Sequence, residues 1–191
     1  MQTIDLITLI PRCHEAAKAK GFWDVTPPMG QQLMLGISEL SEALEAHRKG
    51  NIVDPLNVQG ILNTLKNCPQ YFETRFQANI KDTEADELAD AYIRLCDYAG
   101  GFGLDIDAIN VGRAMQSIDF DRAPDTFAEM MLGLTEFILD IYHATEPAKA
   151  LGEALAGIEY VAGQCNIDLA THIDLKLRYN ATRPYKHAKA Y

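Results

Sequence analysis

The sequence predicts an all-α protein. Apolar residues recur at helical spacing in several segments, capping residues and Gly or Pro delimit these segments, and no segment shows sustained strand alternation. The chain has 191 residues, of which 48% are hydrophobic and 23% charged, enough for one domain with a substantial hydrophobic core. We therefore expect a single all-helical domain over residues 1–191.

The first helix that the pattern defines follows Pro27-Pro28 and ends at Lys49-Gly50-Asn51. Its apolar stripe consists of Leu33, Ile37, Leu40 and Leu44. Glu39, Glu42 and Glu45 lie on the same helix, away from that stripe. The pattern therefore predicts an amphipathic helix with an acidic face.

Two further helices are expected before residue 102. A middle helix starts at Asp54-Pro55 and is broken by Cys68-Pro69. A second acidic helix is capped by Asp82 or Thr83 and stopped by Gly100-Gly101. Its apolar stripe consists of Leu88, Tyr92, Leu95 and Ala99.

Four more helices are expected in the second half of the chain. Their predicted starts are Asp105, Asp125 or Thr126, Pro147 and Asp168. The helix after Asp105 runs toward Ser117, and Glu129 completes a capping box with Thr126.

Two pairs of carboxylates carry the strongest chemical signal. Glu39 and Glu42 are three positions apart on one predicted helix, and Glu87 and Asp90 are three apart on another. Such a pair projects from nearly the same helix face, about 60° apart. Acids held together among apolar residues repel one another unless a cation binds them. The four acids therefore predict an all-oxygen site that suits Mg²⁺ or Mn²⁺ rather than zinc.

The charge distribution argues against nucleic acid as a partner but allows a small anionic ligand. A net charge of −10 argues against nucleic-acid binding, which needs a broad basic surface. After Asp174, however, the chain has no acid and contains the cations Lys176, Arg178, Arg183, Lys186 and Lys189. This tail could bind a small anion, and a solvated basic end is the alternative interpretation.

Cysteine usage and hydropathy indicate the compartment. The four cysteines are far apart and form no Cys-x-x-Cys pair, which favours a reducing, cytoplasmic setting. The sequence has no apolar run long enough to span a bilayer, so we expect no membrane association.

The chain also contains a faint internal repeat. The similar segments are residues 34–40 with 131–137, and residues 98–106 with 161–169. They suggest a carboxylate half, residues 1–109, and a degenerate half, residues 110–191 with the basic C-terminal helix and tail. Leu139 and Ala150 stand at the positions of two of the acids, so the second half cannot build the same site. Chance alignment of helical sequences is the alternative.

The ordered acids and the tail resemble a known family. Glu39-x-x-Glu42 followed by Glu87-x-x-Asp90 is similar to the ExxE…ExxD signature of the MazG-like, all-α NTP pyrophosphohydrolases. The family's C-terminal pattern is matched at Lys176, Tyr179, Asn180, Arg183 and Pro184. The resemblance covers roughly residues 18–50, 80–107 and 165–191. The chain departs from compact family members between about residues 110 and 164, and in having Ala188 where Gly is usual.

The resemblance implies a MazG-like helical bundle that cleaves NTP or dNTP to the monophosphate and pyrophosphate, clearing nucleotides from the pool. It implies Mg²⁺, with Mn²⁺ as a substitute, bound by the four acids, and a homodimer or higher homo-oligomer. Glu45 or Glu84 would orient or deprotonate the attacking water.

The resemblance also implies a set of substrate-binding residues. Those expected to hold the phosphates are Lys176, Arg183 and Lys189. Those expected to contact phosphate, sugar or base are Tyr179, Asn180 and Gln32. Phe22 and Trp23 could stack on the base, although aromatic residues more often pack in a core.

Two other classes of function compete with this one. A nucleotide-binding regulatory protein of the same fold, catalytically weak, would keep the pocket without needing all four acids. A ferritin-like di-iron bundle requires Glu-x-x-His on two helices, and the chain offers only Asp140-Ile-Tyr-His143.

Overall fold

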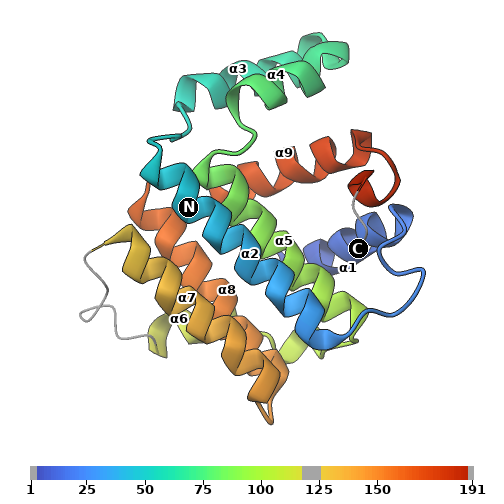
Figure 1. Ribbon diagram of the computed structural model, residues 1–191, viewed down its shortest axis with the longest axis vertical. Coiled ribbons are helices and arrows are strands. Elements are labelled where there is room, and N and C mark those ends of the chain that lie inside the picture. The colour runs from blue at the N-terminus through green and yellow to red at the C-terminus, as the bar shows by residue number, and fades with distance from the viewer. Residues whose placement is uncertain (1–3, 118–125, 189–191) are drawn as a thin grey trace.

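The computed structural model describes residues 4–188 except 118–125, and the side chains of residues 187 and 188 are also outside this description. The described residues form helices and no strand, which confirms the all-α prediction (Figure 1). The α-helices are α1 Leu6–Ala19, α2 Met29–Arg48, α3 Pro55–Asn67, α4 Phe72–Asn79, α5 Glu84–Gly101, α6 Val111–Ser117, α7 Phe127–His143, α8 Pro147–Gln164 and α9 Leu169–Thr182. Short 3-10 helices are η1 Pro69–Tyr71, η2 Ile106–Ala108 and η4 Tyr185–Ala188.

Helix α5 is the centre of the molecule. Every residue from Glu84 to Ala99 is buried except Arg94, which is half-buried. The helix is enclosed because α1, α2, α8 and α9 all pack against it. Its acidic residues therefore lie inside the protein instead of on a solvated face.

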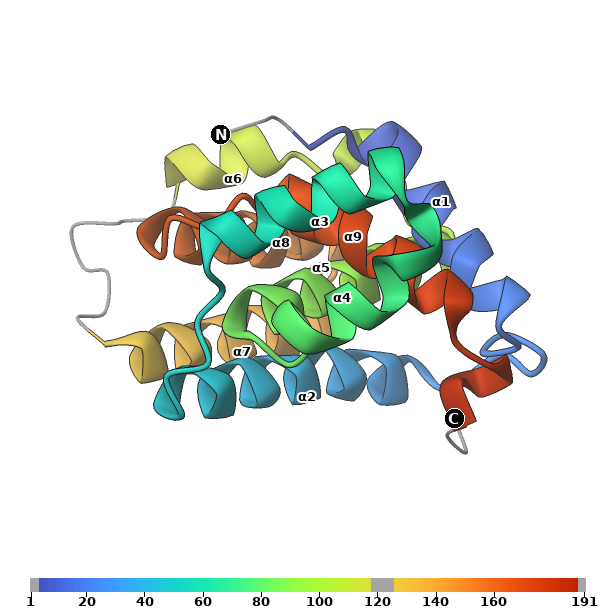
Figure 2. The ribbon, with the colours of Figure 1, turned by 90° about the horizontal axis from the view of Figure 1, so that it is seen from above.

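The four long helices α2, α5, α7 and α8 run alongside one another, as Figure 1 shows. α2 packs mainly on α5 and α7 packs mainly on α8, while α2 and α7 join the two pairs. Each pair carries a further helix on its second member, α1 on α5 and α6 on α8. α9 then makes its main contact with α5, so the end of the chain packs on the first pair (Figure 2).

Helices α3 and α4 project from this bundle (Figures 1 and 2). A small second core attaches them to α9. Its buried members are Ile61, Phe72, Phe76, Ile80, Leu175 and Tyr179. Leu175 and Tyr179 come from α9, so this helix contacts both the projecting pair and α5.

Most predicted helix starts are confirmed by their caps. The side chain of Asp54 accepts from Leu56 N at the start of α3. Thr83 caps α5 by accepting from Asp86 N, and Thr126 caps α7 with Glu129 in the expected capping box. Asp125, the alternative start of α7, lies outside the described residues.

The prediction that Asp105 starts the helix reaching Ser117 is wrong. The Asp105 side chain accepts from Asp107 N and caps only the short η2 turn. Asn110 caps α6 instead, because its side-chain oxygen accepts from Arg113 N at 2.8 Å. Two closely spaced caps compete here, and the chain between them forms a turn rather than a helix.

Helices α1 and α4 were not predicted. The signal for α1 was present, since Asp5 accepts from Ile7 N as its N-cap. The buried residues of α1 are Leu9, Ile10 and Cys13. Pro11, six positions after the cap, weakens that signal because proline lacks the N–H that a helix interior uses. In the parts of the chain that the structure covers, none of the helices has the length and apolar character needed to cross a bilayer.

We predict that Gly101→Ala destabilises the protein. Trp23 lies directly on Gly101, and a Cβ there would lie 2.0 Å from the Trp23 ring. The ring must shift, which we expect to lower the unfolding free energy by about 1–3 kcal/mol, measured by urea denaturation. Gly133→Ala on α7 is the control: no atom lies within 4 Å of its Cβ position, so Ala should be neutral or stabilising there. Equal effects of the two substitutions would contradict the close packing of Trp23.

Candidate functional site

Helices α2 and α5 bring three of the four predicted acids together. Glu39, Glu42 and Glu87 each contribute one carboxylate oxygen to a group whose atoms all lie within 4.8 Å of one another. Glu39 and Glu87 are buried, and Glu42 is exposed at the edge. The acidic cluster, as we call these three residues, therefore opens to solvent on the Glu42 side.

The fourth acid, Asp90, is paired with a lysine. Lys176 Nζ on α9 lies 3.2 Å from Asp90 Oδ2 and 2.6 Å from Asp86 Oδ2 on α5. Lys176 is only 4% exposed. The sequence had assigned Lys176 to the substrate phosphates, whereas the structure places it as the buried counter-ion of two α5 carboxylates. Asp86 was not among the predicted residues, although it directly precedes Glu87.

A second cation, Arg94, was also missed by the sequence analysis. Its Nε donates to Glu39 Oε1 at 3.0 Å, and its side chain is 17% exposed. Arg94 lies one turn after Asp90 on α5. This i, i+4 spacing is the signal in the sequence that places Arg94 on the same helix face as Asp90.

The two cations do not neutralise the acids around them. The group contains five carboxylates, and the cations paired with them are Lys176 and Arg94, while Arg183 also acts on Asp90. The carboxylates are those of Glu39, Glu42, Asp86, Glu87 and Asp90. Burial, with the charge of Asp90, raises the pKa of Glu39 to about 7 despite Arg94. Burial raises the pKa of Glu87 to about 8 despite Lys176.

The pKa of Asp90 moves in the opposite direction. Burial alone would raise it, but the charges of Lys176 and Arg94 outweigh burial and hold it below its ordinary value. The same pairing raises the pKa of Lys176, although burial by itself would lower it. The deficit of positive charge therefore falls mainly on Glu39 and Glu87. Burial also raises the pKa of Asp86, to about 6, despite Lys176.

This arrangement fits a hard divalent cation. All donors of the acidic cluster are carboxylate oxygens, and its excess negative charge is what such an ion would offset. A second group, Asp82, Asp86 and Glu87, also has oxygens within 4.8 Å of one another. Asp86 Oδ1 is buried there without a hydrogen-bond partner. Buried acidic groups on α2 and α5 could thus hold a metal ion.

No protein-family model matches this chain, and neither does any curated protein or solved structure. The geometry of the chain's own residues is therefore the basis for inferring its function.

The two candidates for orienting water occupy different environments. Glu45 is at the surface, where Arg48 and Lys49 pair with it. Glu84 is buried, and its Oε2 lies 2.6 Å from Nδ1 of His47. Glu42 is the carboxylate that combines membership of the cluster with exposure to solvent.

The predicted substrate residues at the C-terminal end of the chain lie in different environments, some in the core and some near the cavity. Tyr179 is buried with its ring stacked on Phe76, so it belongs to the second core. Asn180 lines a cavity beside the acids, and Arg183 at the end of α9 lies over the Tyr179 ring. Arg183 is close enough to Asp90 to help lower its pKa. Lys189 lies outside the described residues.

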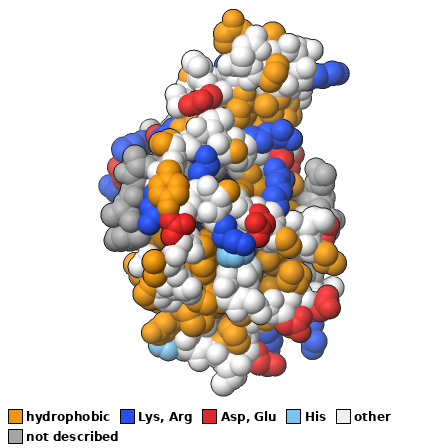
Figure 3. Space-filling model, turned by 90° about the vertical axis from the view of Figure 1, so that its right-hand side faces the viewer, with side chains coloured by type: hydrophobic (Ala, Val, Ile, Leu, Met, Phe, Trp, Pro, Cys, Tyr) orange, Lys and Arg blue, Asp and Glu red, His pale blue; other side chains and the backbone are white. Residues whose placement is uncertain are grey.

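Trp23 and Gln32 have packed positions. The indole Nε1 of Trp23 donates to Asp97 at 2.9 Å, and its ring covers Gly101. Gln32 is buried on α2, two turns before Glu39. One side of the molecule shows Lys and Arg side chains with acids beside them (Figure 3). Arg12 of α1 pairs with Asp174 of α9.

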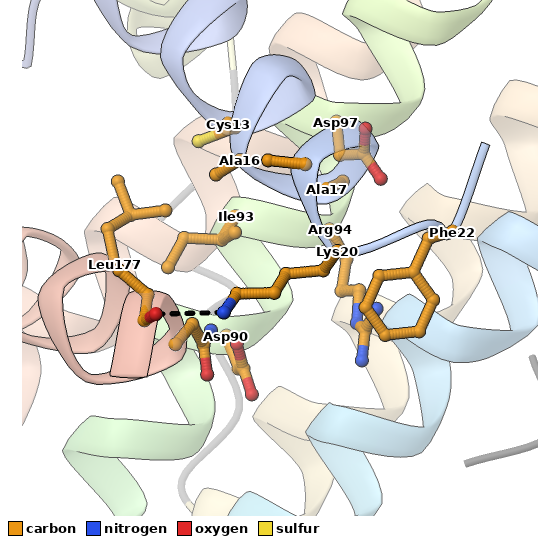
Figure 4. A pocket seen from close by; sticks show the side chains of 13 residues that line it. Cys13, Ala16, Ala17, Lys20, Phe22, Asp90, Ile93, Arg94, Asp97 and Leu177 are labelled. Atoms are coloured by element: carbon orange, nitrogen blue, oxygen red, sulfur yellow. Dashed lines mark hydrogen bonds between the residues drawn. The ribbon is translucent and has the colours of Figure 1, made fainter. Parts of the chain in front are cut away.

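A cavity of about 270 Å³ adjoins Asp90 (Figure 4). Its lining includes Asp90 and Arg94 from α5, Lys20 and Phe22 from the segment that ends α1, and Asn180 from α9. The Lys20 ammonium donates to the carbonyl oxygens of Ala181 and Arg183, which ties the end of α1 to the end of α9. Asp90 thus lies at the edge of a partly enclosed space of small-molecule dimensions.

We expect Lys176→Met to destabilise the protein by about 3–5 kcal/mol, because it leaves Asp86 and Asp90 buried without their counter-ion. Urea denaturation at pH 7 would measure the loss. Lys66→Met at the end of α3, where the lysine is exposed, is the control and should change little. Adding Asp86→Asn to Lys176→Met should recover part of the loss. Without such recovery, the proposed role of the ion pair is wrong.

The raised pKa values of Glu39 and Glu87 predict an unusual pH dependence. Both carboxyls hold their proton more tightly in the folded than in the unfolded chain, so their contribution to stability is largest below about pH 4.5 and is lost as pH rises through 7 to 8. In EDTA, the urea midpoint should therefore rise when pH is lowered from 8.5 to 6. The corresponding change in the free energy of unfolding should be a few kcal/mol at most, since one pKa unit corresponds to about 1.4 kcal/mol.

If the acidic cluster holds Mg²⁺ in the folded state, Mg²⁺ added at pH 8.5 should also raise the urea midpoint, because a ligand that binds the folded state stabilises it. Glu87→Gln is the matched variant. It should flatten the pH dependence and reduce the response to Mg²⁺. A midpoint in EDTA that does not change between pH 6 and 8.5 would contradict the charge deficit.

Proposed function

We propose that the protein is a Mg²⁺-dependent nucleoside triphosphate pyrophosphohydrolase of MazG-like type. The observation that carries the proposal is the acidic cluster itself: three carboxylates from two helices with oxygens within 4.8 Å of one another and too little positive charge beside them. Asp90 and Arg94, on the same helix α5 as Glu87, line the cavity. A polyanionic substrate cannot approach such a cluster alone. It can approach through Mg²⁺, which is why a metal–triphosphate complex is the substrate class that fits best.

The reaction would join a water oxygen to the α-phosphorus and break its bond to the oxygen that bridges the α- and β-phosphates. Nucleoside monophosphate and pyrophosphate leave, and a proton passes to solvent. When bound, Mg²⁺ would neutralise the phosphate charge and lower the pKa of water. Mn²⁺ has the same ligand preference and could replace it.

The protein's residues would divide this work. Glu39, Glu42, Glu87 and Asp90 would hold the metal, and Glu42, exposed to solvent, is the carboxylate that an entering water meets first. Lys176 would keep Asp90 and Asp86 ionised and fixed on α5, which makes it a positioning residue. Asn180 and Arg183, near the cavity, remain the candidates for contact with phosphate or sugar.

The second half would not form an equivalent centre. Glu136 and Leu139 are exposed on α7, and Ala150 on α8 has no ligand atom. We propose that this half is a degenerate copy of the first. The similar packing of α1 and α2 on α5, and of α6 and α7 on α8, supports that relationship.

The decisive experiment measures pyrophosphate and monophosphate released from a panel of NTPs and dNTPs with and without Mg²⁺. We expect Glu42→Gln to lower kcat/KM at least about 100-fold by removing a metal ligand, with little loss of stability because the residue is exposed. Glu136→Gln on α7 is the matched control, an exposed glutamate of the second half, and should retain activity.

Two outcomes would count against the proposal. Full activity of Glu42→Gln would remove this residue from the metal site. Binding of nucleotides without release of pyrophosphate under any metal condition would favour the regulatory protein of the same fold instead.

A further inference from the structure

The cavity that Asp90 lines has a second carboxylate, that of Asp97. Asp97 lies seven residues after Asp90 on α5, which places the two on the same helix face about 10 Å apart. Both line the cavity, and Figure 4 shows them at opposite ends of the group of side chains drawn. A ligand held by its phosphates at the Asp90 end would extend toward Asp97.

The wall between these ends is largely apolar. It contains Ala16 and Ala17 from α1, Ile93 from α5, Leu177 from α9 and the ring of Phe22. Such surfaces accept the faces of a flat ring and offer no competing hydrogen bonds. A polar ring edge that reaches the far end of this wall meets the carboxylate of Asp97.

Asp97 is held as a fixed hydrogen-bond acceptor. His14 Nδ1 lies 2.9 Å from its Oδ1, and Trp23 Nε1 donates to Oδ1 at 2.9 Å and to Oδ2 at 3.1 Å. Its side chain is only 5% exposed. A carboxylate has about four lone-pair positions, so these contacts leave acceptor capacity, chiefly on Oδ2. A rigid, buried acceptor favours a ligand that brings an N–H and disfavours one that brings a carbonyl oxygen.

We propose that Asp97 makes the site selective for nucleotides whose base carries an exocyclic amino group. Cytosine and adenine present this N–H donor, and carboxylates accept from it in base recognition. Uracil and hypoxanthine have a carbonyl oxygen at the corresponding ring position, which Asp97 would repel. This assignment rests on the proposed function and names its substrate class.

The test compares matched substrate pairs, dCTP with dUTP and dATP with dITP, which differ where the amino group is replaced by a carbonyl. The wild-type protein should favour the amino member by at least about tenfold in kcat/KM, as one well-placed hydrogen bond gives. Asp97→Asn presents an NH₂ donor as well as an acceptor, so the preference should fall at least about tenfold and move toward the carbonyl member.

Trp23→Phe separates recognition from structural support. It removes one donor from Asp97 but keeps the carboxylate, so it should lower turnover of both members alike and leave their ratio unchanged. If Asp97→Asn also lowers both members equally, Asp97 only supports the packing of Trp23 and His14, and the inference is wrong. A wild-type preference for the carbonyl members would overturn it as well.

Binding of the same nucleotides, measured by calorimetry with Ca²⁺ in place of Mg²⁺, separates failure of the Asp97 inference from failure of the proposed hydrolase activity. Preferential binding of dCTP and dATP without turnover would leave the Asp97 inference standing and reject the hydrolase. Turnover or binding with no preference rejects the inference alone. Absence of both turnover and binding rejects both.

Discussion

The structure depends on the ion pair that Lys176 forms with Asp86 and Asp90. Helix α5 is buried on nearly every side, yet its first half carries several carboxylates that would each lose a great deal of hydration energy on burial. Lys176 offsets part of that loss, and it does so from α9, the last long helix of the chain. The packing of α9 on α5 thus supplies the counter-ion that the buried carboxylates of α5 require, in addition to a hydrophobic contact.

The same constraint determines the chemistry of the site. Lys176 pairs with Asp86 and Asp90, and Arg94 pairs with Glu39 and also acts on Asp90, so the acidic cluster keeps an excess of negative charge. A protein that needed stability alone could have used apolar residues there. Acids held close together with too little positive charge beside them are what the proposed metal site would require.

The cavity connects this centre to the rest of the fold. Three segments far apart in sequence form it: α1 with the chain that follows it, α5, and the end of α9. Lys20 ties α1 to α9 through two carbonyl oxygens, and Asp97 ties Trp23 and His14 to α5. The elements that enclose the cavity are therefore held by polar contacts to groups that also line it.

The sequence by itself determined the helical class, most helix starts and the two acidic pairs, because these depend on short-range spacing and capping that neighbouring residues settle. It also placed Glu39, Glu42 and Glu87 on two amphipathic helices, each of which packs on the core through its apolar stripe. Only the tertiary structure decided the partners of the charges. The roles of Lys176, Arg94 and Asp97 depend on which helix packs against α5, and contacts between residues as much as 90 positions apart leave no periodic pattern in the chain.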